Sequence, residues 1–163
     1  MTTLTVPYIG EINLENLQDS YSAKVDFSGS FSIDIYLIDK NIDVNDLERI
    51  KAILQNIHNY DSLNKAYFVK DFQTSSAVKE YLEHHLLEIP ELKEYFIENI
   101  GQEAEPIFQL FTKLHLYKVW FSVNAGQDTN VVFDYTFNHE LTQYKLVLMR
   151  KLNGEFIHIT MES

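Results

Sequence analysis

The first 38 residues alternate apolar and polar side chains in the way that β-strands do. Three such segments follow one another. Their apolar positions are Tyr8, Ile12 and Leu14, then Tyr21, Ala23, Val25 and Phe27, and then Phe31, Ile33, Ile35 and Leu37. The sequence Ser28-Gly29-Ser30 fits a three-residue hairpin loop between the last two segments. We expect this loop to place Phe27 opposite Phe31, and Val25 opposite Ile33, because that register keeps the apolar side chains on one face.

From Asp43 to about Leu114 the apolar spacing changes to a helical one. Asp43 is the expected N-cap of the first helix, and Asp46 lies in its first turn, where a carboxylate suits the helix dipole. The apolar stripe of this helix consists of Leu47, Ile50, Ile53, Leu54 and Ile57. A second helix is expected from Leu63 to Phe72.

The third helix has the clearest pattern, with apolar residues at i, i+3, i+4, i+7, i+8 and i+11. These residues are Val78, Tyr81, Leu82, His85, Leu86 and Ile89. Ser75 or Ser76 would cap this helix. Pro90 ends it and can start a fourth helix, which stops at Gly101. The apolar residues of the fourth helix are Leu92, Tyr95 and Phe96, and Pro106 marks the start of a last short helix.

Strand patterns return in the last part of the chain. Their apolar positions are Tyr117, Val119, Phe121 and Val123; Val131, Phe133, Tyr135 and Phe137; and Tyr144, Leu146 and Leu148, before a last strand from Glu155 to Thr160. Asn153-Gly154 indicates a tight hairpin turn. Its facing pairs would be Leu148 with Ile159 and Met149 with His158. The order βββ, helices, ββββ predicts one α+β domain over residues 1–163, with a largely antiparallel sheet of about seven strands and four or five helices packed mainly on one face.

Three aromatic residues fall on the opposite side of their strands from the predicted core set. They are Tyr36, Trp120 and Phe156. Two explanations stay open: helices cover both faces of the sheet, or an aromatic patch is left exposed. An exposed patch of this kind marks a binding site more often than not.

The chain carries 24 acidic and 13 basic residues, which gives a formal net charge of −11. Such a protein repels phosphate backbones and anionic lipids and attracts basic partners, so we expect a basic protein partner, no nucleic acid and no membrane. The chain has no cysteine, and neither a leader peptide nor an apolar run long enough to span a membrane is visible. We therefore expect a cytoplasmic protein. A homodimer is compatible with the sequence.

The acidic residues are concentrated between Glu80 and Glu105, where eight glutamates accompany one lysine. Glu91, Glu94 and Glu98 are spaced to line one stripe of the fourth helix. These three glutamates would steer a cationic partner, and Tyr95 or Trp120 would anchor it. The same charges could also serve only to keep the surface soluble.

The histidines are the main candidates for enzyme chemistry, because no phosphate-binding loop or known catalytic motif is present. Glu80, His84 and Glu88 lie at i, i+4 and i+8, so one helix face could offer them to a metal ion, although such spacings are common on solvated helices. His139 with Asp134 could form an acid–base pair, or these two could be a loop residue and a solvent-facing strand carboxylate. His85, on the apolar side of its helix, is expected to be packed with a hydrogen-bond partner. No cofactor is expected.

The segment from Asn56 to Leu86 resembles a family of uncharacterised bacterial domains. The residues that carry the resemblance are Asp61, Asp71-Phe72, Val78, Tyr81 and His84-His85-Leu86. Some members of that family are associated with polymorphic-toxin immunity loci, so the resemblance implies a bacterial origin and an immunity role, and it assigns no catalytic residue. The leading hypothesis is an acidic binding module, an immunity protein that neutralises a cognate toxin such as a nuclease. The alternative is a small metal-dependent hydrolase or another enzyme.

Overall fold

The structure is a computed structural model, and it describes residues 2–26, 29–74, 77–91 and 111–163. The first strands are β1 (Thr3–Val6), β2 (Gly10–Asn13), β3 (Ser20–Asp26) and β4 (Ser30–Leu37). The helices α1 (Val44–Gln55), α2 (Ile57–Thr74) and α3 (Ala77–Glu88) follow. The last strands are β5 (His115–Val123), β6 (Asn130–Thr136), β7 (Lys145–Lys151) and β8 (Phe156–Glu162).

Six of these strands form one sheet in the order β3-β4-β5-β6-β7-β8, and β1 pairs with β2 in a separate hairpin. Neighbouring strands of the large sheet are antiparallel except β4 and β5, which are parallel. This one parallel pair arises because the helices carry the chain from the end of β4 back to the start of β5. The architecture is α+β with mostly antiparallel strands, as predicted.

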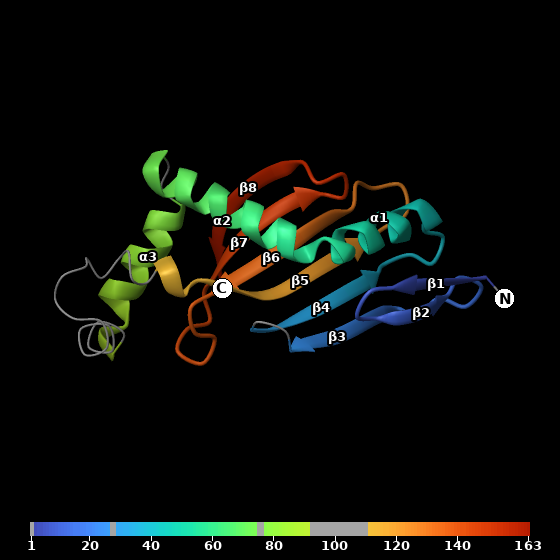
Figure 1. The fold of residues 1–163 in the computed structure, drawn as a ribbon, viewed down its shortest axis with the longest axis horizontal. Coiled ribbons are helices and arrows are strands. Elements are labelled where there is room, and N and C mark those ends of the chain that lie inside the picture. The colour runs from blue at the N-terminus through green and yellow to red at the C-terminus, as the bar shows by residue number, and fades with distance from the viewer. Residues whose placement is uncertain (1, 27–28, 75–76, 92–110) are drawn as a thin grey trace.

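The helices gather on one side of the sheet (Figure 1). α1 and α2 lie across one face, and α3 lies at the end of the sheet, in contact with β7 and β8. The main core fills the space between α1, α2 and the sheet, and it includes the β1–β2 hairpin through Leu4, Val6 and Ile12. None of the helices in the described ranges is both long and apolar enough to cross a membrane.

The described residues contain eight strands, because the first predicted strand is in fact the β1–β2 hairpin. Tyr8 has a φ of 68° and Gly10 a φ of 97°, and these backbone conformations reverse the chain. Pairing Leu4 with Ile12 then buries both side chains. The predicted strand through Tyr8, Ile12 and Leu14 was therefore wrong.

The register of the β3–β4 hairpin differs from the prediction. Val25 pairs with Phe31, and Ala23 pairs with Ile33. Gly29 has a φ of 123° and closes the loop as its last residue, where three-residue loops need a positive φ, rather than lying at its centre. The pairing is offset from the prediction by two residues, so each side chain keeps the face that was expected.

The β7–β8 hairpin confirms the pairs Leu148 with Ile159 and Met149 with His158. A β-bulge after Met149 then brings Phe156 opposite Arg150. The bulge changes the face of Phe156, whose ring stacks on Tyr67 of α2 with centroids 4.4 Å apart. The prediction that Phe156 lies on the side away from the core was wrong.

The first helix begins where its predicted cap places it. Asp43 caps α1 by accepting a hydrogen bond from the backbone N–H of Asn45, and the predicted stripe of α1 is buried. α2 is longer than the predicted Leu63–Phe72, because it starts at Ile57. α3 agrees with the prediction, and Pro90 and Glu91 are helical again. The expected caps Ser75 and Ser76, the rest of the fourth helix and Pro106 lie outside the described residues.

Candidate functional site

The face of the large sheet turned away from α1 and α2 has no described helix over it, and we call it the open face (Figure 1). Phe133 points toward the helices, where its ring lies 6.2 Å from that of Tyr60, so its neighbour Val132 belongs to the open face. Val132 and Val147 are buried there but are not part of the main core. Of the two explanations for the outward aromatic residues, the described residues support an open patch.

The patch is centred on a row of paired residues that crosses three strands. Trp120 pairs with Val132, which pairs with Met149 on its other side. The side chains of Trp120 and Met149 are half-buried, and Tyr36 of β4 is 37% exposed. Val132 is thus shielded by its larger neighbours, which themselves remain accessible.

Pairs of oppositely charged residues lie beside this patch. Lys118 of β5 lies 2.7 Å from the carboxylate of Asp34 on β4, and Ser22 also donates a hydrogen bond to Asp34. Burial opposes ionisation of Asp34, but the bonds from Lys118 and Ser22 outweigh it and lower the pKa of Asp34. The ion pair therefore persists at neutral pH.

Asp134 of β6 pairs across the strands with Lys118. Its pKa shifts in the direction opposite to that of Asp34. Burial raises the pKa of Asp134 to about 6, although a hydrogen bond from Trp120 and the charges of Lys118 and Lys145 act in the other direction. The predicted solvent-facing carboxylate is therefore mostly covered. It exchanges its proton close to neutral pH, which makes the open face sensitive to pH.

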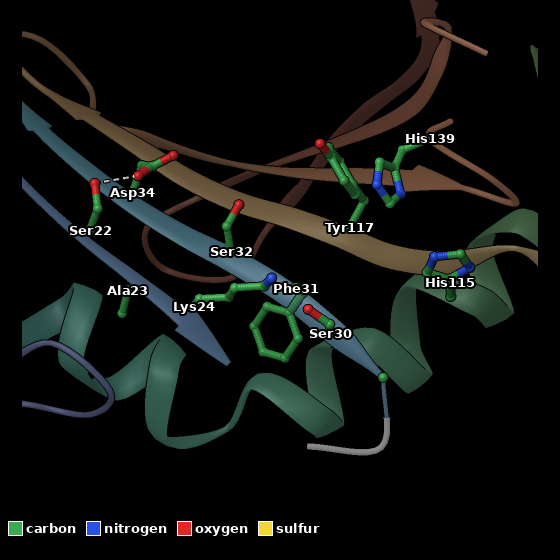
Figure 2. Close-up of a pocket in the computed structure, with 11 residues that line it drawn as sticks. Ser22, Ala23, Lys24, Ser30, Phe31, Ser32, Asp34, His115, Tyr117 and His139 are labelled. Carbon is green, nitrogen blue, oxygen red and sulfur yellow. Dashed lines mark hydrogen bonds between the residues drawn. The ribbon is translucent and has the colours of Figure 1, made fainter. Parts of the chain in front are cut away.

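A groove of about 770 Å³ adjoins the open face at the β3–β5 end of the sheet (Figure 2). Lys24 and Ser32 lie on one side of it, and His115, Tyr117 and His139 on the other. The imidazole of His139 stacks on the Tyr117 ring at 5.1 Å, while His115 Nδ1–H donates to the carbonyl of Lys113. These imidazoles are thus paired with a ring and a carbonyl rather than with a hydroxyl nucleophile.

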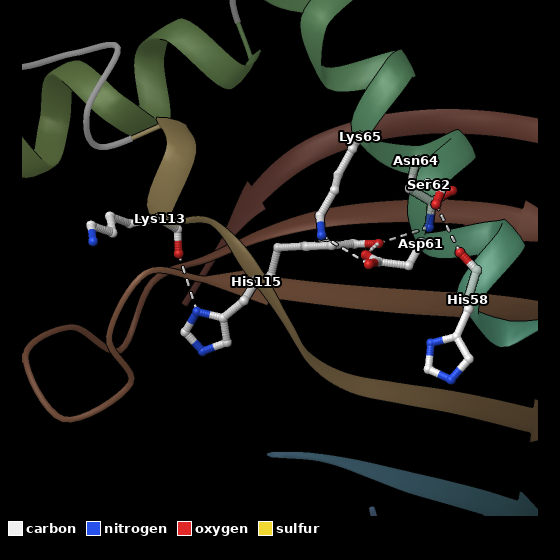
Figure 3. A network of polar contacts seen from close by, with 8 residues as sticks. His58, Asp61, Ser62, Asn64, Lys65, Lys113 and His115 are labelled. Carbon is white, nitrogen blue, oxygen red and sulfur yellow. Dashed lines mark hydrogen bonds and ion pairs between the residues drawn. The ribbon is translucent and has the colours of Figure 1, made fainter. Parts of the chain in front are cut away.

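Below the helices, a chain of polar groups begins at the surface and runs inward (Figure 3). Lys65 Nζ lies 2.9 Å from Asp61 Oδ2, and the hydroxyl of Tyr135 donates to Asp61 Oδ1 at 2.9 Å. Tyr135 is fully buried, and burial raises the pKa of its phenol. Asp61, Lys65, His58 and His115 also line a small cavity of about 60 Å³.

The same chain continues from Tyr135 to the β7–β8 hairpin. The amide of Asn64 donates to the Tyr135 hydroxyl at 3.1 Å, and its oxygen accepts from Nε of Arg150 at 2.8 Å. Arg150 Nη1 donates to the carbonyl of Gly154 at 2.8 Å. Apart from Arg150 Nη2, each polar group inside the chain thus has a hydrogen-bond partner, which is what a polar group needs in an apolar core.

The predicted partner-binding residues do not form one cluster in the described part of the chain. Trp120 lies in the middle of β5 on the open face, whereas Glu91 is exposed beyond the end of α3. Glu94, Tyr95 and Glu98 lie outside the described residues. The proposed roles of Glu91 and Trp120 in binding a partner stay predictions.

The weak metal candidates are on α3. Glu80 and Glu88 are exposed, and His84 is half-buried with its ring edge-on to that of Tyr144 at 4.7 Å. Within residues 2–26, 29–74, 77–91 and 111–163, no three His, Asp or Glu side chains are arranged to hold a metal ion. The structure thus does not assemble Glu80, His84 and Glu88 into a site.

The two remaining histidine predictions have different outcomes. His85 is fully buried, donates from Nδ1 to the Tyr81 carbonyl at 2.6 Å and accepts from the Thr142 hydroxyl at 2.8 Å, so the predicted packed histidine is confirmed. Burial lowers the pKa of His85 to about 4. His139 lines the groove and stacks on Tyr117, and its acid–base pair with Asp134 stays a prediction.

Sequence reasoning missed the polar chain around Tyr135. A signal for it exists, because Asn64 shares the buried side of α2 with Ile57 and Phe68. A polar residue on an apolar helix face needs a partner, and that requirement points to a buried contact.

Comparison of the chain with protein-family models, with curated proteins and with solved structures finds no significant match in any of the three. The resemblance to the uncharacterised bacterial family therefore stays a prediction. Any function must be argued from the residues of this chain.

Proposed function

We propose that this protein is an acidic binding module that docks a basic protein, and that it acts as an immunity protein against a cognate toxin. The observation that carries the proposal is the outer side of α3. Val78, Tyr81 and Leu82 face the core, so the opposite side of the helix is turned to solvent. That side presents exposed glutamates and a leucine.

The exposed residues of this region combine charge with apolar surface. Leu87 is 78% exposed, and Glu80, Glu83, Glu88 and Glu91 are exposed around it. Glu83 pairs with Lys79 at 3.7 Å, whereas the other three glutamates make no ion pair with another described residue. We call Glu80, Leu87, Glu88 and Glu91 the α3 surface. An apolar contact ringed by like charges suits a partner that is basic around an apolar pocket.

Electrostatics also favours this kind of partner. A nuclease toxin must carry positive charge to hold nucleic acid, and an acidic inhibitor can occupy the same cleft. Opposite potentials raise association rates by roughly 10 to 1000-fold, and the gain falls steeply with salt. Binding of this type would protect the producing cell quickly.

The test uses the protein encoded by the adjacent gene, purified and titrated against this protein by surface plasmon resonance. The variant Glu80→Lys/Glu88→Lys/Glu91→Lys should slow association at least about tenfold at low salt, and less at high salt. A matched control, Glu11→Lys/Asp128→Lys/Glu140→Lys, replaces three exposed acidic residues elsewhere. The control therefore has the same net charge as the test variant. Equal slowing in both variants would indicate a general charge effect, and absence of binding at any salt concentration would overturn the immunity role.

The groove beside the open face gives no comparable support to the enzyme alternative. Its imidazoles contact a tyrosine ring and a backbone carbonyl, and the described residues contain no cluster of three His, Asp or Glu side chains that could hold a metal ion. The hydrolase reading therefore stays a prediction from the sequence.

A further inference from the structure

A second cavity, of about 520 Å³, lies between the α1–α2 junction and the β7–β8 hairpin. Its polar lining residues are Arg49, Asn56, Asn59, Tyr60, Arg150 and Asn153. The other lining residues are apolar or glycine, and none is an aspartate or a glutamate. In a protein with a net charge of −11, a cavity lined by two arginines and no carboxylate is an exception.

Arg150 makes the inner wall of this cavity positive. Only 3% of the residue is exposed, it donates hydrogen bonds to the oxygens of Asn64 and Gly154, and its further polar neighbour Tyr67 is also neutral. Its guanidinium carbon lies 5.6 Å from the ring centroid of Tyr60 and 5.1 Å from that of Tyr67. Nη2 is buried without a hydrogen bond. A buried cation without a carboxylate partner gains from an anion nearby.

Arg49, at the exposed opening of the same cavity, can provide a second positive charge. Its side chain is 61% exposed, and its contact with Asp46 is long, at 3.6 Å. An exposed pair of this kind contributes little, so turning the guanidinium toward a ligand costs little. Guanidinium groups bind phosphate and carboxylate with two parallel hydrogen bonds.

Neutral donors complete the lining. Asn59 is exposed at the cavity, and Asn153 uses its side-chain oxygen to accept from the N–H of Glu155, which leaves its NH₂ group to donate outward. The Tyr60 side chain stands beside Gly154, where an added Cβ would come within 2.7 Å of the hydroxyl. Amide, phenol and guanidinium donors together are the chemistry that recognises an oxyanion.

We propose that this cavity binds the oxyanion group, phosphate or carboxylate, of a small molecule. Its volume is in the range of small-ligand sites, so it has room for more than the oxyanion itself. Arg49 would hold the group directly, while Arg150 would supply a fixed positive potential from behind. The site is independent of the α3 surface, so either proposal can fail alone.

The experiment follows backbone and side-chain amide signals by NMR while inorganic phosphate, acetate or adenosine monophosphate is added at constant ionic strength. Saturable shifts should concentrate on Asn59, Asn153 and Gly154. Tighter binding of the nucleotide than of phosphate would indicate that the cavity binds an organic phosphate. Tighter binding of acetate than of phosphate would indicate that it binds a carboxylate. Arg49→Ala should weaken binding about tenfold.

Matched controls separate the site from general charge effects. Lys51→Ala removes a positive charge two residues away on the same helix, outside the cavity lining, and should leave binding unchanged. Asn59→Asp adds a carboxylate to the wall and should abolish binding, whereas Asn41→Asp should not. The proposal is overturned if none of the three anions gives saturable shifts, or if Arg49→Ala and Lys51→Ala respond alike.

Discussion

Val132 and Phe133 are neighbours on β6, but they face opposite sides of the sheet and opposite environments. Phe133 is fully buried beneath the helices, in the main core, whereas Val132 is buried on the face that carries no described helix. Helices α1 and α2 keep water from the first face. On the open face, Val132 lies between the half-buried side chains of Trp120 and Met149 on the neighbouring strands.

The two faces also treat polar groups differently. Under the helices, hydrogen bonds link polar groups in one chain from Asp61 through Tyr135 to Arg150, which lowers the cost of burying them. On the open face, Asp34 and Lys118 pair at the edge of water. This contrast shows that burial, rather than residue type, decides how strongly each polar contact contributes.

The largest expected difference between the faces concerns apolar packing. Phe133→Ala should lower the free energy of unfolding by about 3–5 kcal/mol, because it leaves a cavity beneath the helices. Val132→Ala should cost only about 1 kcal/mol, since its surroundings can relax toward water. Urea unfolding followed by circular dichroism measures both. Equal losses would mean that the open face is packed against another part of the chain.

The second prediction uses the pH dependence of His85, which lies on the buried side of α3. Unfolded His85 binds a proton near pH 6.5, but the folded form does so only at a pKa of about 4. Between these values the unfolded state binds more protons, so lowering the pH from 7 to 4 should cost about 3 kcal/mol through His85. His85→Gln should remove this loss, measured as the difference from wild type across the pH range.

Asp134 on the open face titrates in the same window with the opposite sign. Its pKa rises from 3.8 when unfolded to about 6 when folded, so the folded state binds the extra proton. Raising the pH from 4 to 7 should therefore cost about 1–2 kcal/mol through Asp134, after allowance for its partial exposure. Asp134→Asn should remove this cost. A difference curve with the same sign as that of His85→Gln would contradict the assignment.

The third prediction compares one change on both faces. Tyr135→Phe removes the hydroxyl that links Asp61 and Asn64, and it should cost about 1–3 kcal/mol because it leaves buried polar groups without a partner. Tyr36→Phe removes a hydroxyl 3.5 Å from Lys118 at the surface and should cost less than about 0.5 kcal/mol. Thermal and urea unfolding of both variants measures the two losses of unfolding free energy. Similar losses would contradict the predicted difference between the faces.

The smallest expected effect is that of the ion pair on the open face. Lys118→Met should cost at most about 1 kcal/mol, and the loss should shrink in high salt. The pKa of Asp34 should rise in the variant, which NMR titration can detect, because Lys118 is a main cause of its lowering. Lys40→Met, which breaks the exposed contact with Asp19, is the matched control and should change nothing measurable.

Much of the fold could be predicted from periodicity because strands and helices repeat with different periods. The faces of β4 and the register at Leu148 and Ile159 are examples. The errors occurred where one residue changes the geometry. The positive φ of Tyr8 splits a strand, and the bulge after Met149 moves Phe156 to the other face.

The candidate sites were less predictable than the fold. Trp120 was expected on the outward face from its strand parity, and it is there. The cavity formed by Arg49, Asn59 and Arg150 joins residues about a hundred positions apart, and no local pattern indicates such a meeting. The same is true of Asn64 and Tyr135.

The amino-acid sequence alone determined the acidic balance, the alternation of strands, the apolar stripes of the helices and the cap at Asp43. These are local properties, since each depends on residues a few positions apart. Only the tertiary structure decided which sheet face stays open, how Asp134 and His85 titrate, and where Arg150 is buried. These properties depend on distances between remote segments, and such distances exist only once the chain has packed.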